Sequence, residues 1–278
     1  MAIVQELTGY AVVTGAASGI GQEVAWQLAE TGVAGVLFAD LNEEGAKESA
    51  EKSKGFATNP NYKALALKVD VTNKASVQAV IDAALKEFGR IDYGVHCAGI
   101  GLLSNNPVSD PIEEEYDNVW NVNAKGTALV IGTLVAAMEK NEIATVVGRS
   151  GERQVGRGSI VSLASADSYI VEPFKGPYIA SKHAALSIVK TAALENAEKQ
   201  IRINGLCPSW VQTPMMDEYF RLQPELPNAI QRVHPKKRMA LPEEIASAAL
   251  FLLSPGASYI SGTGLAIDHG VFLSVNTN

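Results

Sequence analysis

The chain has 278 residues, of which 47% are hydrophobic and 19% charged, and this composition is typical of one globular α/β domain. The net charge of −7 argues against a nucleic-acid-binding protein, and the two cysteines, Cys97 and Cys207, lie in apolar segments where buried free thiols are expected. No apolar stretch is long enough to span a membrane and Met1–Thr8 lacks the features of a signal peptide, so we expect a cytoplasmic protein.

Short apolar segments alternate with longer amphipathic segments along the chain. The predicted buried strands are Tyr10–Val13, Gly35–Ala39, Ala64–Val69, Ile91–His96, Ser159–Leu163, Ile201–Leu206 and Gly264–Ile267. Helical periodicity is found in Gly19–Thr31, Glu43–Lys54, Lys74–Phe88, Glu113–Glu139, Tyr178–Glu198 and Pro242–Leu253. This alternation predicts an α/β fold: a single-domain, doubly wound, Rossmann-type parallel sheet of about seven strands, with helices on both faces, over residues 1–278. Ligands are expected at the carboxyl ends of the strands.

Two segments interrupt this alternation. Ile143–Gly158 contains several arginines and glycines and is predicted to be an exposed loop before the fifth strand. Thr213–Arg238 is rich in methionine, aromatic residues and proline. Because the second segment follows the carboxyl end of a strand, we expect residues 213–238 to form a lid over a substrate pocket.

The first predicted strand leads into the glycine-rich run Thr14–Gly21. Glycines permit a tight turn and let the backbone approach a pyrophosphate, and the first N–H groups of the following helix bind such an anion. Strand–helix turns also use glycine for structural reasons alone, but the position after the first strand favours a dinucleotide site. The residues expected to contact the dinucleotide here are Gly15, Ser18, Gly19, Ile20 and Gly21.

The second predicted strand leads directly to Asp40, followed by Leu41, and both are expected to contact the cofactor. A carboxylate at this place accepts hydrogen bonds from the ribose hydroxyls and repels a 2′-phosphate. No Arg or Lys lies in Ala16–Ala17 or just after Asp40, so the sequence favours NAD over NADP. Alternatively, Asp40 caps the helix that begins near Asn42–Glu43.

Two further strand ends carry candidate cofactor contacts. Asp70, followed by Val71, could accept a hydrogen bond from the adenine amino group. Ala98 and Gly99 are small enough to let the backbone pass beside a cofactor. A plain turn at the end of a strand accounts for both places equally well.

Tyr178 and Lys182 are four residues apart in a predicted helix, so both side chains lie on one face. A free phenol has a pKa of about 10, and a nearby ammonium together with a positive nicotinamide ring would lower it. This spacing also occurs by chance. Ser165, just past the fifth strand, strengthens the case because its hydroxyl could hold a substrate oxygen while Tyr178 transfers the proton. Asn123 is either a satisfied core amide or a helix kink that holds a water beside Lys182.

These motifs and their order resemble the short-chain dehydrogenase/reductase family from about Leu7 to Gly270. The resemblance implies that Asn123, Ser165, Tyr178 and Lys182 form the catalytic tetrad. It also implies that Asp70 and Val71 contact adenine, that Pro208, Val211 and Thr213 contact the cofactor, and that Asn123, Tyr178 and Lys182 do so as well. The helices Glu113–Glu139 and Tyr178–Glu198 are expected to build a homo-oligomer, a tetramer or a dimer.

The chain departs from the family pattern at three places. His96 and Cys97 replace two asparagines after the fourth strand, Ser162 replaces an asparagine in the fifth, and Ser209 replaces a glycine after Pro208. The arginine- and glycine-rich loop is similar to that of fungal members that modify natural products. The departures affect local contacts and leave the expected chemistry in place.

The predicted function is NAD-dependent interconversion of a secondary alcohol and a ketone. The residues expected to form an adaptable apolar substrate wall are Met215, Met216, Tyr219 and Phe220, beside Ser165 and Tyr178. Such a wall suits a bulky terpenoid, steroid or polyketide-like substrate, although these residues could simply pack the lid onto the core. The alternatives are a non-redox isomerase on the same scaffold and a non-catalytic NAD-binding protein. No metal site is expected, because the histidines lie far apart.

Overall fold

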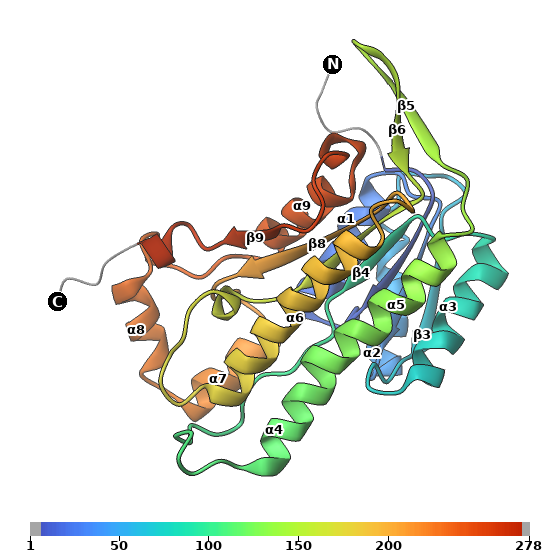
Figure 1. Ribbon diagram of the computed structural model, residues 1–278. Coiled ribbons are helices and arrows are strands. Elements are labelled where there is room, and N and C mark those ends of the chain that lie inside the picture. Colours follow the sequence, from blue (N-terminus) through green and yellow to red (C-terminus); the bar gives the residue numbers. More distant parts are fainter. Residues whose placement is uncertain (1–6, 274–278) are drawn as a thin grey trace.

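The computed structural model describes residues 7–273 and contains a parallel sheet at its centre (Figure 1). The strands of this sheet are β1 (Tyr10–Thr14), β2 (Gly35–Asp40), β3 (Lys63–Lys68), β4 (Tyr93–His96), β7 (Gly158–Leu163), β8 (Ile201–Pro208) and β9 (Gly264–Ile267). Their order is β3-β2-β1-β4-β7-β8-β9, with all neighbours parallel. The predicted doubly wound α/β fold is therefore confirmed. Most of Met1–Thr8, where a signal peptide was sought, lies outside the described residues.

Helices cover both faces of the sheet (Figure 1). The helices on one face are α1 (Gly19–Glu30), α2 (Glu43–Ser53) and α9 (Pro242–Leu253), and those on the other are α3 (Lys74–Phe88), α5 (Gly126–Met138) and α6 (Gly176–Glu195). Successive strand side chains point to opposite faces, so Val13 packs in the first layer and Val12 in the second. Both layers exclude water, which explains why the strands read as continuous apolar runs.

The helix predicted over Glu113–Glu139 is not uniform. It consists of α4 (Glu113–Val119), a π-helical turn over Trp120–Lys125, and α5. A π-turn inserts an extra residue into the helical repeat and so changes the direction in which the following side chains point. Asn123 lies inside this turn, as expected for a residue that interrupts an otherwise apolar helix.

The segment Ile143–Gly158 is mostly exposed, as predicted, but it forms an antiparallel hairpin, so the prediction of a loop is wrong. Its strands are β5 (Ala144–Gly148) and β6 (Gly151–Gly156). Glycine brackets a short turn here, and Gly151 has a φ of 99°, which suits the sharp reversal. The hairpin was not predicted because the arginines of this segment suggested a solvated loop. The hairpin leads into the amino end of β7 and projects from the body (Figure 1).

The predicted lid, residues 213–238, contains two short helices, α7 (Pro214–Leu222) and α8 (Leu226–Val233). Each has proline in its first turn, where the missing N–H costs no hydrogen bond. Since the segment follows β8, it lies at the carboxyl edge of the sheet. Within residues 7–273, no helix combines the length and the apolar character that crossing a membrane would require.

A buried arginine connects β8 to the end of α9. The guanidinium of Arg202 donates hydrogen bonds to the carbonyls of Leu252 (2.7 Å), Leu253 (3.0 Å), Ser254 (3.2 Å) and Ile260 (3.2 Å). These include carbonyls that a helix leaves unpaired at its carboxyl end, where the helix dipole favours a cation. Burial lowers the pKa of Arg202 to about 10, which still leaves it charged at neutral pH.

Candidate active site

A cavity of about 440 Å³ lies at the carboxyl edge of the sheet, where the ends of several strands meet α6 and α7. The predicted site residues that line it are Gly15, Ser18, Gly19, Ile20, Gly21, Asp40, Leu41, Asp70, Val71, Ala98, Gly99, Ser165, Tyr178, Lys182, Pro208, Val211, Thr213, Met215, Met216 and Tyr219. Of the predicted residues, Asn123 and Phe220 do not line it. The fold thus brings together segments that are far apart in the sequence.

The glycine-rich turn between β1 and α1 has space only for glycine. Gly15 has a φ of 72°, and a Cβ on Gly21 would lie 2.2 Å from the carbonyl oxygen of Gly15. Ser18 precedes α1 but its side chain does not cap the helix, so the first N–H groups stay available for an anion. Thr213 closes this end, since a Cβ on Gly19 would lie 3.2 Å from its methyl carbon. This cradle fits a pyrophosphate.

The Asp40 carboxylate lies at the end of β2, beside the glycine-rich turn. It accepts hydrogen bonds from the backbone N–H groups of Ala17 (3.0 Å) and Asn42 (2.9 Å). The cap of α2 is Asn42, whose side chain accepts from Gly45, so the alternative role of Asp40 as the helix cap is wrong. Both backbone contacts fix the carboxylate at the wall of the cavity.

The Asp70 carboxylate closes a local turn and also lines the cavity. Its Oδ1 accepts hydrogen bonds from the backbone N–H of Thr72 (2.9 Å) and from the Thr72 hydroxyl (2.7 Å). The strand-end turn considered from the sequence is therefore present. These bonds use Oδ1, so the second oxygen can still accept a hydrogen bond from a ligand.

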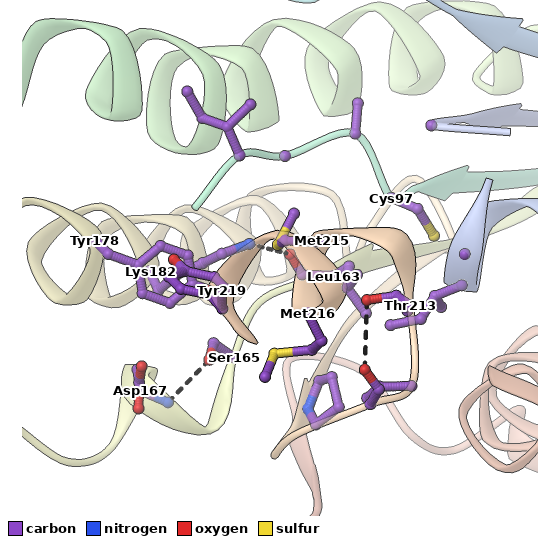
Figure 2. Close-up of a pocket in the computed structure, with 18 of the residues that line it drawn as sticks. Cys97, Leu163, Ser165, Asp167, Tyr178, Lys182, Thr213, Met215, Met216 and Tyr219 are labelled. Carbon is purple, nitrogen blue, oxygen red and sulfur yellow. Dashed lines mark hydrogen bonds between the residues drawn. The ribbon is translucent and has the colours of Figure 1, made fainter. Parts of the chain in front are cut away.

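The hydroxyl of Ser165 is oriented by the turn that follows β7. Its Oγ accepts a hydrogen bond from the backbone N–H of Asp167 at 3.1 Å. Ser168 completes the arrangement, because its hydroxyl accepts from the Ser165 N–H at 3.3 Å. Its oxygen accepts from Asp167, so the Ser165 O–H can donate toward Tyr178 or toward a substrate oxygen that lies between them. Figure 2 shows Ser165 at the same end of the pocket as Tyr178.

Tyr178 lies in the first turns of α6, and its own surroundings keep the phenol protonated. Burial raises the pKa of Tyr178, the Asp167 carboxylate raises it further, and interaction with the Ser165 hydroxyl opposes the rise. The lowering expected from Lys182 is therefore not produced by the chain's own groups. A protonated phenol at this position can donate to a carbonyl oxygen.

The Lys182 ammonium lies deep in the cavity, one helical turn after Tyr178. Its Nζ donates to the carbonyl of Leu163 at 3.2 Å and lies 5.7 Å from the centroid of the Tyr178 ring. Burial lowers the pKa of Lys182 to about 8. A group with this pKa remains mostly protonated at neutral pH and can exchange its proton readily.

Asn123 is a satisfied core amide that borders the site from behind. Its Oδ1 accepts from the N–H of Ile100 (2.9 Å), and its Nδ2 donates to the carbonyl of Ile100 (2.9 Å) and to the hydroxyl of Ser181 (3.1 Å). A Cβ added to Gly99 would lie 3.1 Å from this Oδ1 and 3.5 Å from the Nζ of Lys182. Asn123 thus shapes the backbone that lies against Lys182.

The unusual residues in β4 and β7 are buried below the cavity. Nδ1 of His96 lies 2.7 Å from the Thr14 hydroxyl, and burial lowers the pKa of His96 to about 3, so the ring is neutral. His96 and Ser162 are register partners, and neither the His96 Nε2 nor the Ser162 Oγ has a hydrogen-bond partner among the described residues. The imidazole therefore replaces the expected amide without adding charge.

The lid helix α7 is attached to the loop after β4. The Tyr219 hydroxyl accepts a hydrogen bond from the N–H of Leu102 at 2.6 Å. Gly101 permits this approach, because a Cβ there would lie 2.2 Å from the hydroxyl oxygen. Met216 points toward the cavity beside Met215 (Figure 2). The structure thus supports Met215, Met216 and Tyr219 as pocket walls, whereas Phe220 does not line the cavity.

Sequence reasoning missed several side chains at the substrate end of the cavity. They are Asp167, Glu172, Lys175, Trp210, Gln223 and Leu226. Lys175 forms an ion pair with Glu172. The position of Asp167, two residues after a predicted catalytic serine, was the one signal that could have indicated it. Within residues 7–273, no group of His, Cys, Asp and Glu side chains could hold a metal ion.

Comparisons with known proteins agree with this geometry. The family model described as enoyl-(acyl carrier protein) reductase matches residues 15–272. The chain is 43% identical to the short-chain dehydrogenase anuF of Penicillium roqueforti over 98% of this chain and 99% of that protein. It is 31% identical to the 2,5-dichloro-2,5-cyclohexadiene-1,4-diol dehydrogenase of Sphingobium indicum, over 93% of this chain and 95% of that protein.

The same relationship is seen in three dimensions. The crystal structure of levodione reductase matches with a TM-score of 0.84 and 29% identity, over 96% of this chain and 98% of that chain. The similarity covers both the glycine-rich turn and the residues of α6, since it extends over nearly the whole chain. The chain therefore belongs to the short-chain dehydrogenase/reductase family.

Proposed function

We propose that the protein is an NAD-dependent oxidoreductase that interconverts a secondary alcohol and a ketone on a bulky, largely apolar substrate. The observation that carries this proposal is the joint placement of the Ser165 hydroxyl and a protonated Tyr178 phenol, which interact with each other, at one end of a dinucleotide-sized cavity. Two groups that can donate to one oxygen are what a polarised carbonyl requires. The names of the diol dehydrogenase and levodione reductase relatives support the same reaction class.

The side chains divide the chemistry among them. When bound, the nicotinamide supplies or accepts the hydride at the carbinol carbon. Ser165 donates to the substrate oxygen and fixes its position, while Tyr178 gives its phenolic proton to that oxygen in reduction and removes it in oxidation. Lys182, held by the Leu163 carbonyl at 3.2 Å, keeps a positive charge near the phenol ring, and we expect this charge to favour the phenolate only together with a bound, positively charged nicotinamide.

The preference for NAD is expected to depend on Asp40. Of the described residues that line the cavity, only Lys175 and Lys182 are basic, and both belong to α6 or its N-cap and not to the β2 end that carries Asp40. We expect NADH to bind at least about tenfold more tightly than NADPH, because Asp40 repels a 2′-phosphate. In Asp40→Ala this preference should largely disappear. Fluorescence titration of both reduced cofactors measures the two dissociation constants.

A second substitution separates charge from backbone support at Asp40. Asp40→Asn keeps an acceptor for the Ala17 and Asn42 N–H groups but removes the charge. It should therefore weaken discrimination between the cofactors while retaining the fold. Tighter binding of NADPH than NADH by the unmodified protein would show that the assignment of NAD is wrong.

The apolar wall is tested by two substitutions on α7. Met216 is buried and lines the cavity, whereas Phe220 lies on the same helix outside it. Met216→Ala should raise KM for apolar ketones by about tenfold, from lost contact area of the order of one buried side chain. Phe220→Ala should leave KM unchanged, so it serves as the matched control. Equal KM values for Met216→Ala and the unmodified protein would remove the apolar wall from the proposal.

The rival on this scaffold is a rearrangement that uses the nicotinamide only transiently. It predicts conversion of substrate without any net change in absorbance at the NADH band. Following product formation and absorbance in the same sample separates the two reactions. The proposal requires one NADH consumed for each ketone reduced.

A further inference from the structure

The substrate end of the cavity contains a carboxylate that the proposed catalytic steps do not use. Asp167 lines the cavity and lies in the short helical turn Ala166–Ser168 that follows Ser165. Figure 2 shows it at the same end of the pocket as Ser165 and Tyr178, with Cys97 and Thr213 at the other end. Asp167 is therefore next to the space for the substrate and remote from the glycine-rich turn.

The Asp167 carboxylate has no hydrogen-bond donor among the described residues. Its backbone N–H is engaged by the Ser165 hydroxyl, but the side chain makes neither a hydrogen bond nor an ion pair within residues 7–273. The neighbouring carboxylate of Glu172 is different, because it is paired with Lys175. A partly buried carboxylate without a hydrogen-bond donor has lost part of its hydration, and the nearby Lys175, Lys182 and His183 offset only part of this loss. Consistent with this, burial raises the pKa of Asp167.

The surroundings of Asp167 favour a neutral donor over a second cation. Although burial opposes it, the carboxylates of Asp167 and Glu172 together raise the pKa of Lys175, so positive charge is already present close by. Met216 and Trp210 contribute apolar surface to the same cavity, where an additional ammonium would lose its hydration. The group that satisfies Asp167 with the least desolvation is a hydroxyl.

We propose that Asp167 accepts a hydrogen bond from a second hydroxyl group of the substrate, remote from the carbon that exchanges hydride, and so selects hydroxylated ketones and the corresponding diols. This inference rests on the proposed function, because it assigns the substrate class of the same site. Ser165 and Tyr178 hold the reacting oxygen, and Asp167 binds the second oxygen. Together these contacts fix the orientation of the substrate in the cavity.

The expected size of the effect follows from the charge of the acceptor. A hydrogen bond from a hydroxyl to a desolvated carboxylate strengthens binding by about tenfold or more relative to the same ligand without the hydroxyl. The probes are α-tetralone and its ring-hydroxylated derivatives, which place a hydroxyl at different distances from one ketone. Their dissociation constants are measured by NADH fluorescence on the protein saturated with NADH, and kcat/KM is measured in parallel.

Three variants assign the selectivity to the carboxylate. Asp167→Leu should reduce the ratio of affinities between the best hydroxylated ketone and α-tetralone to about one. Asp167→Asn, which keeps shape and hydrogen bonding but not charge, should give an intermediate ratio and covers the case in which the leucine variant does not fold. Asp217→Asn is the matched control, because Asp217 is exposed on α7 and does not line the cavity. The ratio compares two ketones on the same variant, so any effect of Asp167 on the pKa of Tyr178 acts on both ketones and cancels.

The outcomes separate this inference from the function on which it rests. Tenfold tighter binding of at least one hydroxylated isomer, lost in Asp167→Leu and kept in Asp217→Asn, supports it. Equal or absent binding of all isomers overturns it, as does an advantage that persists in Asp167→Leu. Tighter binding of an aminomethyl-substituted α-tetralone than of the ring-hydroxylated tetralones overturns it as well, because Asp167 would then select a cationic group and not a hydroxyl. Hydroxyl-selective binding without NADH consumption would count against the redox function alone.

Discussion

Replacing Tyr178 with Phe is expected to lower kcat for ketone reduction by roughly a thousandfold, the usual loss when a positioned general acid is removed. The buried ring keeps its place in α6, so the fold and the cavity are retained. Only the hydroxyl that donates to the substrate oxygen is lost. Steady-state rates at the NADH band, with binding of NADH measured on the same sample, give kcat and cofactor affinity separately. NADH affinity should change by no more than a few fold.

The control for this prediction is a second tyrosine in the same cavity. Tyr219→Phe also removes one phenolic oxygen, but that oxygen accepts from the Leu102 N–H at 2.6 Å and holds the lid. Its loss should raise KM with less than about a tenfold effect on kcat, because positioning and proton transfer are separate contributions. Comparable kcat values for Tyr178→Phe and the unmodified protein would mean that another group transfers the proton.

Replacing Arg202 with Leu is expected to reduce the free energy of unfolding by about 3 kcal/mol or more, because several carbonyls lose a charged donor. Those carbonyls belong to Leu252, Leu253, Ser254 and Ile260, and water cannot easily replace the guanidinium at this buried place. Removing a buried charge offsets part of the loss. Chemical denaturation monitored by circular dichroism measures the difference.

Two other substitutions show whether geometry or charge matters at Arg202. Lysine keeps the charge but cannot reach several carbonyls at once, so Arg202→Lys should lose a large part of the same free energy. Arg221 is an exposed arginine on α7, and Arg221→Leu should change stability by no more than about 0.5 kcal/mol. A leucine variant as stable as the unmodified protein would show that Arg202 does not hold the end of α9.

The sheet could be predicted from the sequence because strands buried on both faces carry a continuous apolar signal. Val12 and Val13 face opposite layers, yet both are apolar, and the same holds for Leu37 and Phe38 in β2. The hairpin β5–β6 lacks that signal, since its strands are mostly exposed and their polar residues suggested a loop. Pairing between two exposed strands depends on cross-strand contacts that a hydropathy pattern does not record.

The site residues that could be predicted from the sequence lie close together along the chain, and those that could not are brought together by the fold. The glycine-rich turn and the Tyr178–Lys182 pair each lie in one continuous segment, so their spacing could be read directly. Asp167 and Trp210 come to line one cavity because they follow β7 and β8, which are adjacent in the sheet. Phe220 was misplaced because Met216 and Tyr219 of α7 line the cavity and Phe220 does not, which depends on how the helix is placed against the cavity.

The segment Gly99–Leu102 has a mechanical consequence, since it is held at both ends by functional residues. Ile100 is clamped by both polar atoms of the Asn123 amide, and Leu102 is bonded to Tyr219 on the lid. The lid helix α7 and Asn123 are therefore linked through this short segment. A compound that binds against Gly101 is therefore expected to break the hydrogen bond between Leu102 and Tyr219 and to lower activity without contacting Tyr178.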